Sequence, residues 1–297
     1  MTTETAPALN QSLDRDKERS AEAQPAEANA GKAKSGLQVF GAISQRRRLL
    51  LGLLGVVSFI ALWWLANALE FASPRLLPSP WQVLVALYDL IQKGFLYDVL
   101  KSVYRITFSF ALAVAVAYPL GLLMGTSASV SAFFGPLISA FRYLPAPAFV
   151  PLLLMWLGAG DGQKVALLFL GVVWFLATVI ADHVRAVPRD FVDSARTLGA
   201  DTRQVYFTVI APASWPRVWD ALRQMLAVSW TYLVIAEIVA ATDGIGAMMM
   251  RAQRFVRVDD VMAGILTIGI LGVCFDLLFR FVGKRLFVYE AIEQERS

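Results

Sequence analysis

The sequence predicts an all-α, polytopic membrane protein with six transmembrane helices. Of the 297 residues, 57% are hydrophobic and only 17% are charged, and the mean hydropathy is +0.58. Apolar runs recur along the chain, and several reach about 20 residues, the length that a helix needs to cross a hydrocarbon core of about 30 Å. This composition is typical of a membrane protein and excludes an ordinary soluble domain.

The first span is predicted at residues 49–70, directly after Arg46, Arg47 and Arg48. Arginines at the entrance of a first span favour a cytoplasmic N-terminus. Residues 81–92 then carry apolar side chains at helical spacing but are too short to cross a membrane. We expect a helix that lies in the outer membrane interface, and a buried connector is the alternative.

The second span, 102–125, has a small residue at every fourth position, which allows another helix to approach closely. The third span, 132–157, contains four prolines and a single arginine, Arg142. Prolines interrupt the hydrogen bonds of a helix, and such backbone is tolerated at membrane depth only inside protein or beside a water-filled cavity. This span is therefore our first candidate for lining a translocation path. The small residues are Ala113, Ala117, Gly121 and Gly125, and the prolines are Pro136, Pro145, Pro147 and Pro151.

The remaining spans are predicted at residues 165–182, 220–242 and 260–282. Ionisable groups within spans are costly and often functional. By residue count Arg142 and Glu237 fall at comparable depth, so we expect them either to pair or to face the cavity. Asp276 and Arg280 stand one helical turn apart and are expected to pair. The candidates for the translocation path are Arg142, Tyr143, Pro145, Tyr232 and Glu237.

A polar stretch between the fourth and fifth spans, residues 189–216, carries helix signals of its own. Gly199 can adopt the left-handed conformation that ends a helix. Asp201 and Gln204 have the spacing of a capping box at the start of a second helix. Pro212 has no backbone N–H, so we expect it to end that second helix.

Residues 1–45 have no apolar periodicity and are predicted to form a disordered cytoplasmic tail. Residues 287–297 form a second cytoplasmic tail, which leaves 46–286 as the transmembrane domain. Six spans place both termini and the 189–216 stretch on one side, where most of the Lys and Arg residues fall. Arg251, Arg254 and Arg257 depart from this asymmetry, because they fall on the outer side.

The chain has one cysteine, Cys274, and one histidine, His183. It therefore has neither the pair of cysteines that a disulfide needs nor a set of ligands for a His/Cys metal cage. No nucleophile and base stand in a pattern typical of catalysis. We expect no catalytic residue, no metal, no cofactor and no nucleic acid partner.

The 189–216 stretch resembles the EAA loop of permease subunits of ATP-binding-cassette (ABC) importers. That loop reads acidic–small–small, then Gly, then Ile-x-Pro, with Asp here in place of the usual Glu and Ser in place of one Ala. Residues 49–286 resemble the branch that serves nitrate, sulfonate and taurine, although Tyr143 replaces a proline of its Leu-Arg-Pro-Ile-Pro motif. The positions of the EAA loop, with the alanine that follows its glycine, are Asp193, Ser194, Ala195, Gly199, Ala200, Ile210 and Pro212.

The resemblance implies a type I ABC importer permease (MetI-like) fold in a bacterial inner membrane. It also implies that residues 189–216 form the coupling helix, which docks on an ATPase subunit. The expected partners are two ATPase subunits, an external solute-binding protein, a second copy of the chain and membrane lipid. The expected cargo is a small, anionic solute such as a sulfonate or nitrate.

Function can also be considered without the family. The chain has no nucleotide-binding loop of its own, so energy from ATP must reach it through contact with another protein. The 189–216 stretch is predicted to be cytoplasmic and joined directly to spans, as such a contact requires. The alternative is a stand-alone secondary transporter or channel, but we find no clear inverted repeat and few buried acids. A membrane enzyme and a scaffold are weaker alternatives.

Overall fold

The computed structural model describes residues 44–71, 73, 75–240 and 242–287. The chain divides into two compact units, residues 1–58 and 59–297, and the division falls within α2 (Gln45–Ala68). The first unit contributes the start of α2, an apolar helix. The tails predicted at 1–45 and 287–297 lie outside the described residues, except for Ser44, Gln45 and Phe287.

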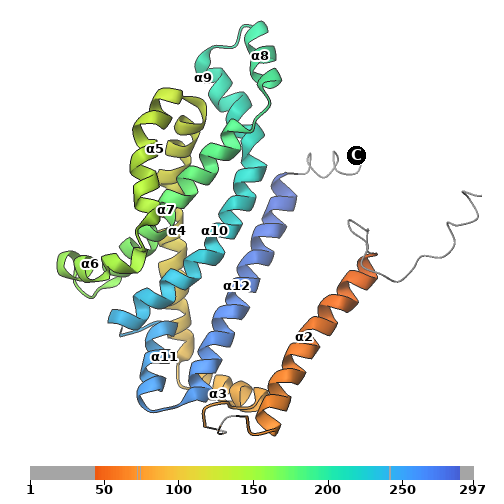
Figure 1. Ribbon diagram of the computed structural model, residues 1–297, viewed down its shortest axis with the longest axis vertical. Coiled ribbons are helices and arrows are strands. Elements are labelled where there is room, and N and C mark those ends of the chain that lie inside the picture. The colour runs from red at the N-terminus through yellow and green to blue at the C-terminus, as the bar shows by residue number, and fades with distance from the viewer. Residues whose placement is uncertain (1–43, 72, 74, 241, 288–297) are drawn as a thin grey trace, which may run out of the picture. The chain divides into compact units, whose positions relative to one another are not determined.

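The described part of the second unit is built from helices, without strands (Figure 1). After α2 they are α3 (Pro80–Gln92), α4 (Phe95–Thr126), α5 (Ala128–Tyr143), η1 (Ala146–Phe149), α6 (Val150–Leu157), α7 (Asp161–Arg185), α8 (Arg189–Thr197), α9 (Thr202–Gln204), η2 (Val205–Ile210), α10 (Ala211–Ala240), α11 (Ile245–Arg254) and α12 (Val258–Leu286).

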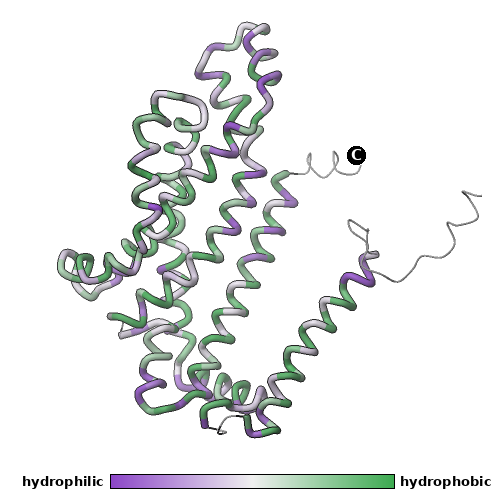
Figure 2. The backbone as a smooth tube through the Cα atoms, viewed as in Figure 1, coloured by the Kyte–Doolittle hydropathy of each residue, from purple (hydrophilic) through white to green (hydrophobic). Residues whose placement is uncertain are grey.

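Five helical stretches of the described chain are long and apolar enough to cross a membrane, and a bent pair, α5 with η1–α6, makes a sixth. The all-α fold with six spans is therefore confirmed. The long helices are hydrophobic over most of their length, whereas α8 is largely hydrophilic (Figure 2). A membrane span must satisfy its backbone polar groups internally, which a helix does.

The third span is not one helix. Residues 128–143 and 146–157 meet at an angle of 87°. Leu144 is extended because the ring of Pro145 disfavours a helical conformation in the residue before it. The predicted interruption by proline is thus confirmed, and the bend falls next to Arg142 and Tyr143.

Pro212 does not end the second helix of the 189–216 stretch, so this prediction is wrong. Residues 202–239 run as one helix of 38 residues. Directly before the proline, the N–H of Ala211 donates to the carbonyl of Tyr206, five residues earlier, in the wider turn η2. Such a turn allows a helix to accommodate a proline without breaking.

The main core forms where α4, α7 and α10 pack together, with side chains from α5 and α6. The predicted stripe of small residues lies here: a Cβ on Gly121 would stand 2.7 Å from the Cβ of Ile180, and one on Gly125 would stand 2.5 Å from the Cβ of Val184. Close approach of the α4 and α7 backbones therefore requires glycine at both positions.

A second cluster of buried side chains joins α3, α11 and α12 to the start of α4. Helix α3 buries Val83, Ala86 and Leu90 in this cluster and exposes Trp81 and Tyr88. Its start is fixed by Ser79 and Gln82, which form a capping box. Helix α3 is therefore amphipathic, with one face packed against protein and one face free.

The contact between α4 and α7 gives a first prediction. Gly121→Ala should lower the free energy of unfolding by about 1–3 kcal/mol, because the added methyl group overpacks the helix contact. Thermal unfolding in detergent measures the change. Gly135→Ala on α5 is the matched control: beyond its chain neighbours and its own helix backbone, no atom of the described residues lies within 4 Å of its Cβ position, so this variant should be neutral or slightly more stable. Equal melting temperatures for the two variants would contradict the packing.

Candidate functional site

The first helix of the hairpin (residues 189–216) ends as the sequence predicts. Helix α8 stops at Thr197, and Gly199 adopts a left-handed conformation with φ +86°. The N–H of Gly199 donates to the carbonyl of Arg196 at 2.9 Å, and the N–H of Ala200 donates to the carbonyl of Ala195 at 3.0 Å. These bonds satisfy carbonyls that the helix end leaves free, which fixes the turn.

The second helix of the hairpin begins at the predicted capping box. The N–H of Gln204 donates to Oδ1 of Asp201 at 2.7 Å, and the N–H of Asp201 donates to Oε1 of Gln204 at 2.8 Å. A capped start and a left-handed turn leave the hairpin tip little freedom, although few of its side chains are buried. The hairpin is therefore a defined shape attached directly to α7 and α10.

The hairpin presents two large apolar side chains that are mostly exposed. Leu198 is 89% exposed, and Phe207 is 64% exposed. Of the predicted coupling residues, Asp193, Ser194, Gly199 and Pro212 are exposed, and Ala195, Ala200 and Ile210 are half-buried. Exposed apolar side chains on a polar, rigid element are typical of a contact surface for another protein.

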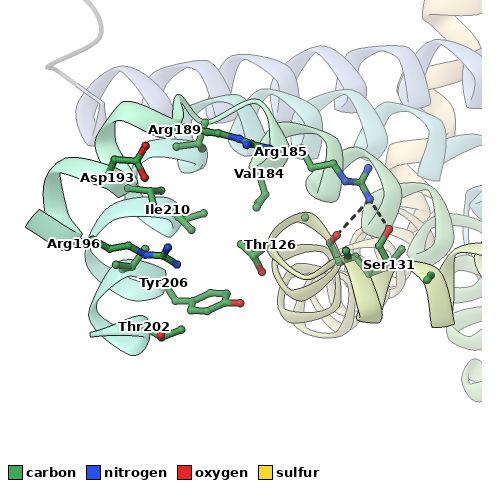
Figure 3. A pocket seen from close by; sticks show the side chains of 17 residues that line it. Thr126, Ser131, Val184, Arg185, Arg189, Asp193, Arg196, Thr202, Tyr206 and Ile210 are labelled. Atoms are coloured by element: carbon green, nitrogen blue, oxygen red, sulfur yellow. Dashed lines mark hydrogen bonds between the residues drawn. The ribbon is translucent and has the colours of Figure 1, made fainter. Parts of the chain in front are cut away.

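A cleft of about 890 Å³ separates the hairpin from the turn between α4 and α5 (Figure 3). Asp193 and Arg196 of α8 and Tyr206 of η2 lie on its hairpin side, facing Thr126. Arg185, at the end of α7, donates to Oγ of Ser131 at 2.9 Å. This bond holds the α4–α5 turn against α7, so the cleft has one wall that is fixed to the helix core.

A cluster of charges around a buried arginine lies at the other ends of α4, α7 and α10. We call it the Arg105 cluster: Ser102, Arg105, Asp161, Glu237 and Asp243. The Arg105 side chain is 1% exposed; its Nη1 donates to Oε1 of Glu237 at 2.8 Å, and its Nη2 donates to Oδ1 of Asp161 at 2.6 Å. Nη2 also donates to a carboxylate oxygen of Asp243. One guanidinium thus joins two helices and a loop to α4.

The Glu237 carboxylate holds the turn that follows α10. It accepts hydrogen bonds from Oγ of Ser102 at 2.8 Å and from the N–H of Gly246 at 2.8 Å. A Cβ on Gly246 would stand 2.7 Å from the Cβ of Glu237, so the backbone of the turn lies directly on this side chain. The start of α11 is therefore fixed to the end of α10.

Residues 117–288 match the protein family described as "Binding-protein-dependent transport system inner membrane component". The match covers more than half of the chain, including the hairpin, the end of α4 and the last two spans. The chain belongs to this family of permeases. It is the permease subunit of a binding-protein-dependent importer and a multi-pass protein of the cytoplasmic membrane.

Two relatives agree with this assignment, and one solved structure shares the fold. The permease is 34% identical to the taurine transport system permease protein TauC of Escherichia coli, over 82% of this chain and 90% of the relative. It is 29% identical to the putative aliphatic sulfonates transport permease protein SsuC of Bacillus subtilis, over 79% and 86%. The MetNI methionine ABC transporter, in an inward-facing conformation, shares the fold, with a TM-score of 0.53 and 19% identity over 64% of this chain and 92% of that one.

The permease does not bring the predicted path residues together. Arg142 and Glu237 do not pair: the Arg142 guanidinium lies over the Phe175 ring, 5.3 Å from its centroid, while Glu237 pairs with Arg105. Tyr143 is 88% exposed, and Pro145 is exposed beside it at the bend. The Tyr232 ring packs on Gly171 of α7.

Sequence reasoning missed Arg105 as the partner of Glu237. The available signal was an arginine near the start of the second span with Ser102 and Ser109, small polar residues, on the same helix face. By contrast, the predicted pair of Asp276 and Arg280 is present, with Nε and Oδ2 2.7 Å apart. Asp276 also accepts a hydrogen bond from Arg223 of α10 at 2.7 Å.

The Arg105 cluster gives a second prediction. Arg105→Gln removes the cation shared by three carboxylates and should lower the free energy of unfolding by about 3–5 kcal/mol. Thermal unfolding of the purified permease in detergent measures the loss. Adding Glu237→Gln should restore part of it, because the buried charge without a partner is removed. Arg280→Gln is the control, since its ion pair is exposed and contributes about 0–1 kcal/mol. Similar losses for Arg105→Gln and Arg280→Gln would contradict this account of the cluster.

Proposed function

We propose that this permease forms the translocation path of an ATP-driven importer and that its hairpin receives the driving motion from a separate ATPase subunit. One observation carries the proposal: the capped, exposed hairpin is continuous with the helix that reaches Glu237. ATP hydrolysis then belongs to the ATPase subunit, and this chain has no catalytic role.

The helix from Thr202 to Val239 is about 57 Å long at 1.5 Å per residue. Its first turns belong to the hairpin, its middle packs against α7, and its end holds the Arg105 cluster. A displacement of the hairpin would therefore reach the opposite end of the bundle through one element. Packed helices respond to such a displacement by moving as rigid bodies, because dense cores have low compressibility.

The hairpin fits a groove on the ATPase better than a flat surface. Leu198 and Phe207 supply exposed apolar side chains, and the carboxylate of Asp193 and the guanidinium of Arg196 on α8 have no hydrogen-bond or ion-pair partner in the described chain. A helical element with apolar anchors and a polar rim is a common way for one protein to dock in the groove of another. The residues proposed to couple are Asp193, Ser194, Ala195, Gly199, Ala200, Ile210 and Pro212.

Both termini and the hairpin are proposed to lie in the cytoplasm. Arg46, Arg47 and Arg48 stand at the entrance of the first span, and Lys284 and Arg285 at the exit of the last. Basic residues at these positions favour the cytoplasmic side. Residues 46–286 then form the transmembrane domain, between two cytoplasmic tails.

The proposed path follows the bend between α5 and α6. Arg142, Tyr143 and Pro145 are exposed there, where interrupted backbone needs water or protein around it. A guanidinium beside the path suits an anionic solute, and the relatives are named for taurine and aliphatic sulfonates. We propose a small anion such as a sulfonate or nitrate as cargo. Tyr232 and Glu237 contact protein in this structure and would face the path only after a rearrangement.

The proposed assembly contains two copies of this chain, two ATPase subunits and one external solute-binding protein within the lipid bilayer. The family description supports the binding protein, since these are components of binding-protein-dependent systems. Large apolar side chains on α12, including Val273 and Leu277, are exposed and available to a second copy or to lipid.

The hairpin gives a third prediction. Gly199→Asp should abolish ATP-driven uptake in liposomes that contain the whole importer, while membrane insertion is retained. Apart from its chain neighbours, no atom of the described residues lies within 4 Å of the Cβ position of Gly199, so the new carboxylate projects outward to where the ATPase would dock. Asp also tolerates the left-handed conformation better than most residues. Substrate uptake and ATP hydrolysis are measured together.

Gly199→Ala is the matched control. It carries the backbone cost of a side chain at φ +86° but adds only a methyl group, at a Cβ position that has only its chain neighbours within 4 Å in the described chain. This variant should retain uptake. Wild-type uptake by Gly199→Asp would contradict the coupling role. Solute flux through liposomes that contain the permease alone would instead favour a stand-alone transporter.

A further inference from the structure

The turn between α11 and α12 holds a valine in a left-handed conformation. Val256 has φ +56°, in the region that glycine usually occupies. The N–H of Val256 donates to the carbonyl of Gln253 at 3.0 Å, and the N–H of Arg257 donates to the carbonyl of Ala252 at 3.0 Å. This is the helix ending in which glycine is preferred at the left-handed position. A β-branched residue is strained there, and such strain clusters at functional positions.

The strained turn displays apolar side chains. Phe255 is 78% exposed and Val256 is 64% exposed, at the point where two helices meet. Neither side chain belongs to the buried cluster that α11 and α12 form below them. Glycine would end α11 without strain but would remove one of the two exposed side chains. The chain therefore presents two exposed apolar side chains at this turn, although glycine would suit the left-handed backbone of position 256 better.

The space next to this pair is polar, which favours water and protein over hydrocarbon. A cleft of about 560 Å³ runs between the turn and the segment before α3. Arg75, Gln82 and Asp259 line it together with Phe255 and Val256. Charged and amide groups facing acyl chains would be strongly unfavourable. The turn thus suits a soluble partner that fills a polar cleft and covers an apolar pair.

The free charge around the turn has a small positive excess, and the cation within the turn itself, Arg254, is exposed. Arg251 is paired with Asp98, with Nη2 and Oδ2 2.7 Å apart, and Arg257 is paired with Asp260, with Nε and Oδ2 2.9 Å apart. These pairs account for two of the three arginines that depart from the charge asymmetry of the sequence. The residues around the turn that have no ion-pair partner among those described are three cations and two acids: Arg75, Lys93, Arg254, Asp89 and Asp259.

We propose that the turn Arg254–Arg257 is the surface on which the external solute-binding protein docks, and that this partner presents an acidic rim around an apolar pocket for Phe255. The proposal rests on the proposed function, which places the hairpin in the cytoplasm. The helix of residues 202–239 leads away from the hairpin to the end of the bundle where α11 begins (Figure 1). The turn then faces outward, and complementary charge steers the two proteins together.

Docking at this turn would act on the loop that carries Asp243 of the Arg105 cluster. Nη1 of Arg251 donates to the carbonyl of Thr242 at 2.6 Å, and its Nη2 donates to Asp98 of α4. Asp98 in turn accepts a hydrogen bond from the N–H of Gly244 at 2.7 Å. Helix α11 is therefore fixed to both α4 and the loop after α10. A partner that moves the turn moves the end of the helix that leads to the hairpin.

The test uses the assembled importer in nanodiscs. The partner is the purified binding protein that stimulates ATP hydrolysis by the wild-type complex.

Val256→Gly relieves the strain and removes an exposed side chain, so it should raise the melting temperature while weakening binding at least fivefold. Phe255→Ser and Arg254→Glu should weaken binding at least tenfold without lowering the melting temperature. Binding is measured as a dissociation constant without ATP, and higher salt should weaken wild-type binding. Phe133→Ser on α5, where the side chain is 75% exposed, is the control and should bind normally.

Unchanged binding by Val256→Gly and Phe255→Ser would overturn the proposal. So would a Phe255→Ser variant whose defect is confined to retention or stability in lipid, because the turn would then be a membrane anchor. The Gly199→Asp hairpin variant separates the two proposals. It should bind the partner normally yet fail to transport; if it transports normally while Phe255→Ser loses binding, the coupling role fails and the docking surface stands.

Discussion

The buried guanidinium of Arg105 is the constraint on which the arrangement of these helices depends. It brings carboxylates from α7, α10 and the following loop to one point on α4. Taking such charges out of water is costly, and the cost is offset only when every donor and acceptor is matched. The helices therefore meet at this end in one register. The two apolar clusters, which share α4, are joined here by polar contacts.

The helix from Thr202 to Val239 is continuous, so it joins the Arg105 cluster to the hairpin. One end of the helix is fixed by the Arg105 cluster, and the other end is exposed in the hairpin. The wider turn before Pro212 keeps the two ends in one element, although proline normally ends a helix. The permease thus contains a direct mechanical connection between its two polar ends.

The fold and the hairpin could be predicted because their signals are local. The left-handed turn at Gly199 and the capping box at Asp201 depend on residues within a few positions of one another. Packing of Gly121 and Gly125 followed from a four-residue spacing. The partner of Glu237 could not be found in this way, because Arg105 lies 132 residues earlier and pairing depends on how α4 and α10 pack. The prediction that Pro212 ends a helix was wrong because the wider turn η2, which accommodates the proline, is set by the surrounding helix.

The hairpin is proposed to touch the ATPase subunit and to move with it. The direct measurement is cross-linking from Leu198→Cys in a Cys274→Ser background, within the assembled importer. We predict an efficient cross-link to the ATPase whose yield changes when ATP is bound, and no labelling by a reagent confined to the outside of the cell. A hairpin that is labelled from outside, or that cross-links only to lipid or to proteins without nucleotide-binding activity, would contradict the claim.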